Sequence, residues 1–190
     1  MSKTAVYILS FFVIVLFALG VMGLAQGRRT GLAGARYPAQ GRFAEVDGVR
    51  LHYEQAGSGK AVLLLHGSPG LTRDFKVAVP LPPDEAGNGV RLSLFQDLAR
   101  DHRVIVVDRP GHGWSERDGH RSVGLLRQAE LMAGLLDKLD ASPAVVVGHS
   151  YGGALALAMA VEEAEQVEAV VILGTPAYRD AFAVAPIELA

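Results

Sequence analysis

The amino-acid sequence predicts an α/β fold, in which crossover helices cover a mostly parallel sheet and one transmembrane helix precedes it. Two observations predict the sheet. Short apolar runs rich in β-branched residues alternate with segments of helical apolar spacing, and three of these runs end in glycine-containing loops that carry polar side chains. A third observation predicts the transmembrane helix, because residues 5–25 carry no charge.

The composition is that of one ordinary globular domain, since 50% of the 190 residues are hydrophobic and 20% are charged. Eighteen basic against twenty acidic side chains give a net charge of −2, which leaves no basic excess to neutralise a phosphate backbone. We therefore expect no nucleic-acid partner. The absence of cysteine excludes disulfides, thiolate metal sites and a cysteine nucleophile, and we expect neither a metal nor a cofactor.

The first element is the uncharged segment 5–25, predicted to anchor the chain in a membrane as residues 1–25. At about 1.5 Å per helical residue it reaches about 31 Å, close to the thickness of the bilayer hydrocarbon. A cleaved secretory signal is the alternative, because Gly23 and Ala25 place small residues at positions −3 and −1 of a cleavage site. The apolar core of such a signal usually spans only about 7 to 15 residues, which favours the anchor.

Residues 26–41 are rich in glycine, alanine and arginine and show no apolar periodicity, so they are predicted to form a flexible linker. Arg28, Arg29 and Arg36 follow the apolar segment, whereas Lys3 and the amino terminus precede it. The positive-inside rule then weakly favours a cytoplasmic position for the domain, and the side of the membrane stays open.

The domain at 42–190 is predicted to begin with an antiparallel hairpin that turns at Asp47-Gly48. Buried parallel strands are expected at 61–65, 104–107, 144–147 and 169–173. Helices are expected between them at 92–98, 125–139 and 154–161. Residues 71–90 contain several prolines and glycines, which predicts either an ordered loop over the site or a mobile flap.

The strand at 144–147 leads through Gly148-His149-Ser150-Tyr151-Gly152 into a helix of small residues. This G-x-S-x-G pattern between a strand and a helix is typical of a nucleophile elbow, a sharp turn that lifts a serine hydroxyl clear of the sheet. Glycines two residues before and after the serine are required because a Cβ there would collide with neighbouring backbone. Ser150 is thus the candidate nucleophile.

The strand at 61–65 ends in His66-Gly67-Ser68-Pro69-Gly70, where Gly67 lets the backbone approach a ligand closely. The N–H groups of Ser68 and Tyr151 are predicted to form an oxyanion hole. The positive end of the helix after Ser150 favours negative charge at the same place.

The third motif is the run D-R-P-G-H-G-W-S at 108–115. Asp108 at a strand end is expected to accept hydrogen bonds from loop amides rather than to take part in chemistry. His112, between two glycines, is expected to be a solvated or loop-bonded imidazole and not a catalytic base.

The order of these three motifs, each at the end of a parallel strand, resembles the α/β-hydrolase fold in its branch of serine esterases and lipases. The resemblance covers about residues 42–176 and implies that Ser150 is the nucleophile, with the oxyanion held by the N–H groups of Ser68 and Tyr151. It argues against an epoxide hydrolase or a haloalkane dehalogenase, since those relatives attack through an aspartate at the elbow.

The chain departs from this family in one respect. Members supply their triad in the order serine, acid, histidine, yet all six histidines here precede Ser150. Asp180 is a weak candidate for the acid. The short domain and a bare strand at 169–173 suggest the N-terminal part of a longer hydrolase, truncated before its last strands; a naturally short chain is the alternative.

The predicted function is therefore a membrane-anchored serine hydrolase that acts on an ester or related acyl bond of a small molecule. Its histidine, and with it the acid, would lie outside these 190 residues, so this chain alone is expected to be a poor catalyst. The alternative is a non-catalytic binding protein, or an inactive short product, that keeps the elbow only as architecture.

Overall fold

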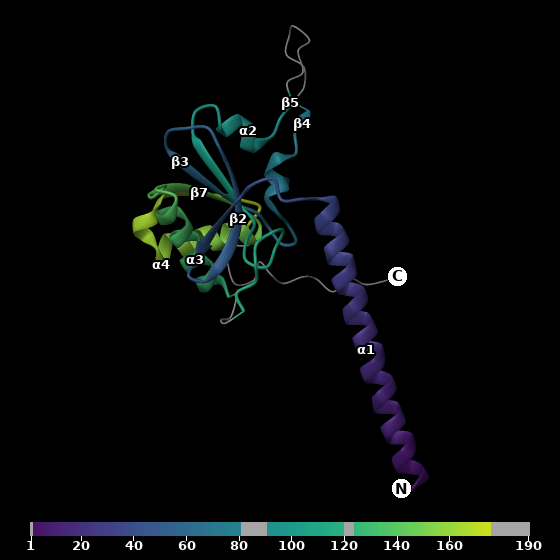
Figure 1. Cartoon of the computed structure of the whole chain (residues 1–190). Coiled ribbons are helices and arrows are strands. Elements are labelled where there is room, and N and C mark those ends of the chain that lie inside the picture. The colour runs from purple at the N-terminus through teal and green to yellow at the C-terminus, as the bar shows by residue number, and fades with distance from the viewer. Residues whose placement is uncertain (1, 81–90, 120–123, 176–190) are drawn as a thin grey trace, which may run out of the picture. The chain divides into compact units, whose positions relative to one another are not determined.

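The computed structural model describes residues 2–80, 91–119 and 124–175 (Figure 1). The chain divides into two compact units, Met1–Gln40 and Gly41–Ala190.

The first unit is the single helix α1 (Lys3–Arg36). Within it, Tyr7–Gln26 is long and apolar enough to cross a membrane, a test that an N-terminal signal sequence also passes. The predicted flexible linker is wrong over residues 26–36, because the backbone stays helical to Arg36. Alanine, arginine and leucine are good helix formers, and the first proline, Pro38, comes only after the helix ends.

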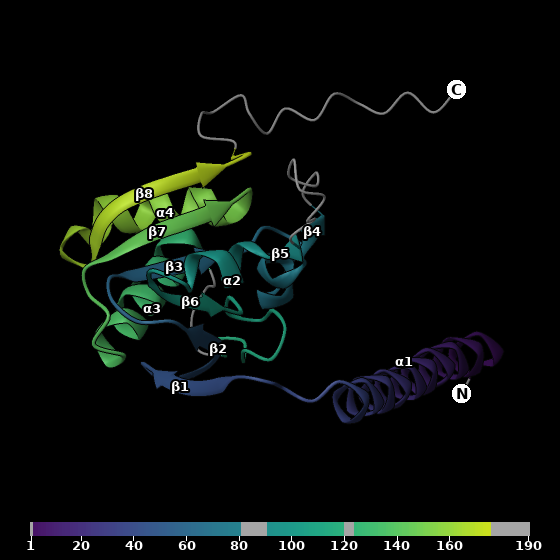
Figure 2. The same ribbon diagram turned by 90° about the horizontal axis from the view of Figure 1, so that it is seen from above.

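The second unit contains a six-stranded sheet of the order β1-β2-β6-β3-β7-β8, which Figure 2 shows from β8 at the top to β1 at the bottom. β1 and β2 form the predicted hairpin, β2 runs antiparallel to β6, and the remaining neighbours are parallel. The fold is α/β with a mostly parallel sheet, as predicted. The strands are β1 (Arg42–Val46), β2 (Val49–Ala56), β3 (Ala61–Leu65), β6 (Arg103–Val107), β7 (Ala144–His149) and β8 (Val167–Leu173).

Helices cover both faces of the sheet, which explains why its central strands are apolar without interruption. On one face, Leu63 and Leu65 of β3 belong to the core cluster that includes α3 (Leu125–Lys138) and α4 (Tyr151–Glu162). On the other face, Leu64 belongs to a second cluster. That cluster includes Phe75 and Phe95 from the 3-10 helix η1 (Thr72–Lys76) and from α2 (Leu94–Leu98). Successive strand residues point to opposite faces, so both sets must be apolar.

Two predicted helices begin two or three residues away from their expected starts. The helix expected from residue 92 begins at Leu94, because the Ser93 side chain accepts a hydrogen bond from the Gln96 N–H and caps it. The helix expected at 154–161 starts at Tyr151, directly after the elbow. The loop expected at 71–90 holds η1 and the short strand β4 (Val79–Pro80), which pairs with β5 (Arg91–Leu92); residues 81–90 lie outside the described residues.

β8 lies at one end of the sheet order and, within the part of the chain that the structure describes, pairs only with β7. A 3-10 turn, η2 (Ala164–Gln166), leads into it from α4. Val171, Ile172 and Leu173 are 44%, 42% and 40% exposed, whereas every residue of β3 is buried. The apolar face of β8 is therefore only partly covered by the described residues.

Candidate active site

Ser150 occupies a strained turn between β7 and α4. Its φ of 53° and ψ of −119° lie in a region that residues with a Cβ rarely adopt. A Cβ on Gly148 would lie 2.2 Å from the Gly152 carbonyl oxygen, and one on Gly152 would lie 2.1 Å from the Leu65 carbonyl oxygen. Both glycines are thus required by close backbone contacts, which is the packing expected of a nucleophile elbow.

The elbow is held from both neighbouring strands. The N–H of Ser150 donates a hydrogen bond of 2.9 Å to the carbonyl oxygen of Leu173, at the end of β8. Gly153, in the first turn of α4, lies against Thr175, since a Cβ on Gly153 would come within 1.8 Å of the Thr175 Oγ1. Ser150 is therefore fixed by the strand that follows it in the sequence as well as by β3.

The loop after β3 lies directly against Ser150. A Cβ on Gly67 would be 3.1 Å from the Cβ of Ser150, which is tighter than most Cβ contacts, so a glycine lets the loop approach this closely without displacing its neighbour. Tyr151 is the first residue of α4, where an N–H has no partner within the helix. Among the described residues, the N–H groups of Ser68 and Tyr151 donate no hydrogen bond. The geometry leaves both donors available beside Ser150.

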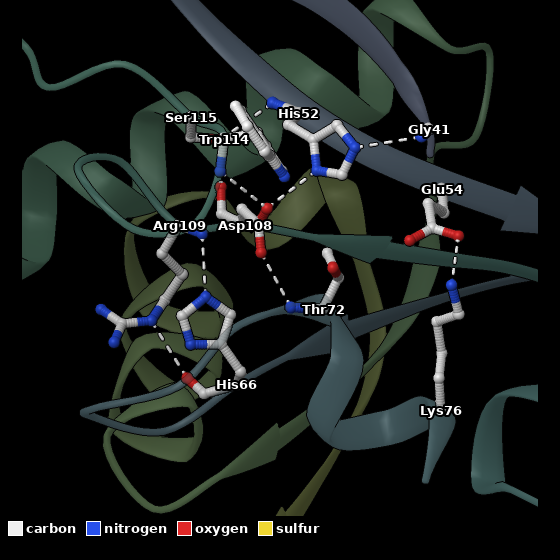
Figure 3. A network of polar contacts seen from close by, with 10 residues as sticks. All are labelled: Gly41, His52, Glu54, His66, Thr72, Lys76, Asp108, Arg109, Trp114 and Ser115. Carbon is white, nitrogen blue, oxygen red and sulfur yellow. Dashed lines mark hydrogen bonds and ion pairs between the residues drawn. The ribbon is translucent and has the colours of Figure 1, made fainter. Parts of the chain in front are cut away.

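Arg109 lies behind this loop and is 1% exposed. Its Nε donates to the His66 carbonyl oxygen at 3.0 Å (Figure 3), and its Nη2 donates to the Gly67 carbonyl oxygen at 2.8 Å. Its Nη1 donates to the Gln128 Oε1 at 2.9 Å, and its guanidinium carbon lies 4.6 Å from the centre of the Tyr151 ring. One side chain thus contacts both the Gly67 loop and the first residue of α4.

His66 is fully buried, and the contacts of its two ring nitrogens assign its tautomer. The backbone N–H of Arg109 donates to Nε2 at 3.0 Å (Figure 3), so the proton is on Nδ1, which donates to the Gly67 carbonyl oxygen at 2.8 Å. Burial lowers the pKa of His66 to about 4, with Arg109 and His112 acting in the same direction. His66 is neutral at pH 7 and has no free nitrogen with which to accept a proton from Ser150.

Asp108 forms a second buried network, at the end of β6. Its carboxylate accepts hydrogen bonds from the Thr72 N–H at 2.8 Å, the Trp114 N–H at 3.0 Å and the His52 Nδ1 at 2.8 Å (Figure 3). Burial favours the neutral acid, but these hydrogen bonds outweigh it and hold the pKa of Asp108 below its ordinary value. The prediction that Asp108 binds loop amides is confirmed, and the network joins η1, β2 and the 108–115 loop.

His52 completes this network on its other side, since its Nε2 accepts the Gly41 N–H at 3.2 Å. The half-buried ion pair between Lys76 and Glu54, at 2.6 Å, also joins η1 to β2 (Figure 3). Both contacts hold elements together and neither involves Ser150.

The remaining candidates are placed as follows. The imidazole of His112 is bound by its own loop, with Nδ1 3.3 Å from the Pro110 carbonyl oxygen, as expected. Asp180 and His120 lie outside the described residues, so the candidate acid stays a prediction. Within the described ranges no three metal-ligating side chains cluster. No described histidine hydrogen-bonds the hydroxyl of Ser150.

Sequence reasoning missed Arg109, Gln128 and His52. Arginine is usually exposed, and no local pattern marks one that is buried by residues distant in the sequence. The one available signal was position, because Arg109 lies two residues after the end of a buried strand, at the same edge of the sheet as the two glycine loops.

Comparisons with known proteins agree with the α/β fold described above. A family described as the alpha/beta hydrolase fold matches residues 60–186. The 2-hydroxymuconate semialdehyde hydrolase of Pseudomonas sp. (strain CF600) is 31% identical over 139 residues, which cover 73% of this chain and 44% of that protein. The bifunctional epoxide hydrolase 2 of Sus scrofa is 34% identical over 143 residues, which cover 75% of this chain and 23% of that protein.

Among solved structures, a meta-cleavage product hydrolase from Pseudomonas fluorescens IP01 superimposes with a TM-score of 0.59 at 26% identity. That match covers 73% of this chain and 46% of the other. The chain thus spans less than half the length of each of these relatives.

Proposed function

The chain belongs to the alpha/beta hydrolase family, and from this premise we propose that it carries the nucleophile and the oxyanion hole of a membrane-anchored serine hydrolase. The observation that supports the proposal most is the strained turn at Ser150 with the Gly67-Ser68 peptide packed against it. Structural turns do not need two glycines, a φ of 53° and two free N–H donors at one point.

In the proposed reaction, the Ser150 hydroxyl oxygen attacks the carbonyl carbon of an ester or related acyl group, and a base takes the hydroxyl proton. The carbonyl oxygen becomes an oxyanion, which accepts hydrogen bonds from the N–H groups of Ser68 and Tyr151. Collapse of this intermediate expels the leaving group, which receives the proton, and water then hydrolyses the acyl-enzyme.

The base in this proposal is a histidine outside residues 1–190. The nearest buried candidate, His66, has both ring nitrogens bound and a pKa of about 4, so it cannot serve at neutral pH. The similarity to an epoxide hydrolase extends to the fold, but the hydroxyl of Ser150 cannot form the ester that an elbow carboxylate would. The substrate class proposed here is a small acyl compound.

A fluorophosphonate probe tests the proposal, because it labels only a serine whose proton can be removed and whose oxyanion is stabilised. The protein expressed from its whole coding sequence should be labelled, and Ser150→Ala should abolish labelling. Ser142→Ala is the matched control: Ser142 is an exposed serine whose hydroxyl donates to the Asp137 carboxylate, and this variant should be labelled as strongly as the wild type. The 190-residue chain alone should be labelled weakly.

Substitutions of Ser68 distinguish the role of its backbone N–H from that of its side chain. Ser68→Ala keeps the N–H and should keep most of the activity, whereas Ser68→Pro deletes the donor and should reduce turnover by about 100-fold. Turnover is measured with p-nitrophenyl acetate and with 2-hydroxymuconate semialdehyde, the compound that appears in the name of the relative from Pseudomonas sp.. Equal labelling of the wild type and Ser150→Ala would refute the proposal. Absence of labelling in both would favour the non-catalytic binding protein.

A further inference from the structure

Arg109 is buried without a carboxylate partner among the described residues. Its neighbours there are two backbone carbonyl oxygens, the amide of Gln128, the imidazole of His112 and the ring of Tyr151. Burying a guanidinium is costly, and buried arginines are ordinarily paired with an acid. An arginine retained in this environment needs a reason other than an ion pair.

The hydrogen bonds of Arg109 set the orientation of the Gly67–Ser68 peptide. The Gly67 carbonyl oxygen accepts from Arg109 Nη2 at 2.8 Å and from His66 Nδ1 at 2.8 Å. In a planar trans peptide the N–H points opposite to the carbonyl. Two donors on the carbonyl side therefore direct the N–H of Ser68 away from Arg109.

The same guanidinium contacts the other half of the hole. The guanidinium carbon lies 4.6 Å from the centre of the Tyr151 ring. The Gln128 amide links the two side chains, because it accepts from Arg109 Nη1 at 2.9 Å and donates to the Tyr151 hydroxyl at 3.2 Å. The first residue of α4 is thereby held at a fixed position relative to the Gly67 loop.

We propose that Arg109 is a positioning residue that holds the N–H groups of Ser68 and Tyr151 in one geometry, so that both reach the same oxyanion. The proposal rests on the serine-hydrolase function proposed above. Hydrogen bonds to an oxyanion strengthen only in the transition state, so a misplaced donor lowers kcat and leaves ground-state binding almost unchanged.

The test compares Arg109→Met and Arg109→Lys with the wild type, all expressed from the whole coding sequence. The readouts are kcat and KM with p-nitrophenyl acetate and the inhibition constant of a trifluoromethyl ketone, which binds serine hydrolases as an oxyanion. For Arg109→Met we expect kcat to fall about 100-fold and the inhibition constant to rise by a similar factor, with KM within about threefold of the wild type.

Arg109→Lys keeps the charge, but a lysine ammonium cannot donate to two carbonyl groups and an amide from one plane. The kcat of this variant should therefore be at least about tenfold below that of the wild type. It also fills most of the buried volume, which keeps the test informative if Arg109→Met fails to fold. Arg127→Met is the matched control, because Arg127 forms ion pairs with Asp118 and Glu130 outside the site. The kcat of this variant and its inhibition constant should equal those of the wild type.

The outcomes separate the two proposals. A wild type that a fluorophosphonate does not label at Ser150 would refute the serine-hydrolase function and this proposal with it. A labelled wild type with both Arg109 variants at wild-type kcat would overturn the positioning role alone. So would full recovery by lysine, or a rise in KM with kcat unchanged.

Discussion

Acidification from pH 7 to pH 5 should destabilise the folded domain through His66. The buried imidazole has a pKa of about 4, whereas in the unfolded chain it has the ordinary value of 6.5. Between these two values the unfolded chain binds more protons than the folded one, so stability falls as the pH decreases through this window. The contribution is complete above pH 6.5 and is lost progressively down to pH 4.

The size of this effect follows from the two pKa values. Protonation linkage gives a loss of about 2 kcal/mol between pH 7 and pH 5 from His66 alone. With a urea dependence of about 2 kcal/mol per molar for a domain of this size, the unfolding midpoint should fall by about 1 M. Trp114, the single tryptophan of the chain, reports unfolding by its fluorescence, measured on the whole chain in detergent micelles.

His66→Gln provides the control, because glutamine offers a donor and an acceptor but does not titrate. The other histidines are common to both proteins, so the difference between their pH dependences isolates His66. The variant should lose about 2 kcal/mol less than the wild type between pH 7 and pH 5, whatever its stability at pH 7. An identical pH dependence in the two proteins would show that His66 is not buried as a neutral imidazole.

Three further predictions concern other parts of the chain. The protein should resist carbonate extraction from membranes because of Tyr7–Gln26, and a soluble product that begins near residue 26 would indicate a cleaved signal instead. Gly152→Ala should prevent stable folding, because its Cβ would lie 2.1 Å from the Leu65 carbonyl oxygen. The control Gly119→Ala, whose Cβ would meet nothing within 4 Å, should have a melting temperature near that of the wild type. Equal melting temperatures for the two variants would contradict the elbow geometry. Asp108→Asn should lower the free energy of unfolding by about 2–4 kcal/mol, measured by urea titration, because an NH₂ group then replaces a carboxylate oxygen and faces N–H donors instead of accepting from them. A decrease of less than about 1 kcal/mol would contradict the network.

The strands were predictable because their signal is local. Five consecutive apolar residues at 61–65, followed by His66-Gly67, indicate a buried strand without any knowledge of its neighbours, and β3 has these bounds. Gly148 and Gly152, the two glycines around Ser150, likewise predict a sharp turn that the structure contains. In both cases the sequence pattern is a direct consequence of contacts within or next to the segment.

Features that depend on distant residues were not predictable. The burial of Arg109 results from contacts with Gly67, Gln128 and Tyr151, which are brought together only when three strands align. The continuation of α1 to Arg36 was missed for a different reason. Its glycines suggested a linker, but each glycine costs only about 1 kcal/mol in a helix that is already formed.

The hydrogen bond from the Ser150 N–H to the Leu173 carbonyl oxygen has a consequence for the order of folding. During synthesis the strained turn emerges before the residue that holds it, because α4 and η2 separate the two. Ser150 is therefore stabilised in its unfavourable backbone conformation only after β8 has paired with β7. Later fraying of β8 breaks the same hydrogen bond, so the amide hydrogen of Ser150 should exchange with solvent at the rate at which this strand opens.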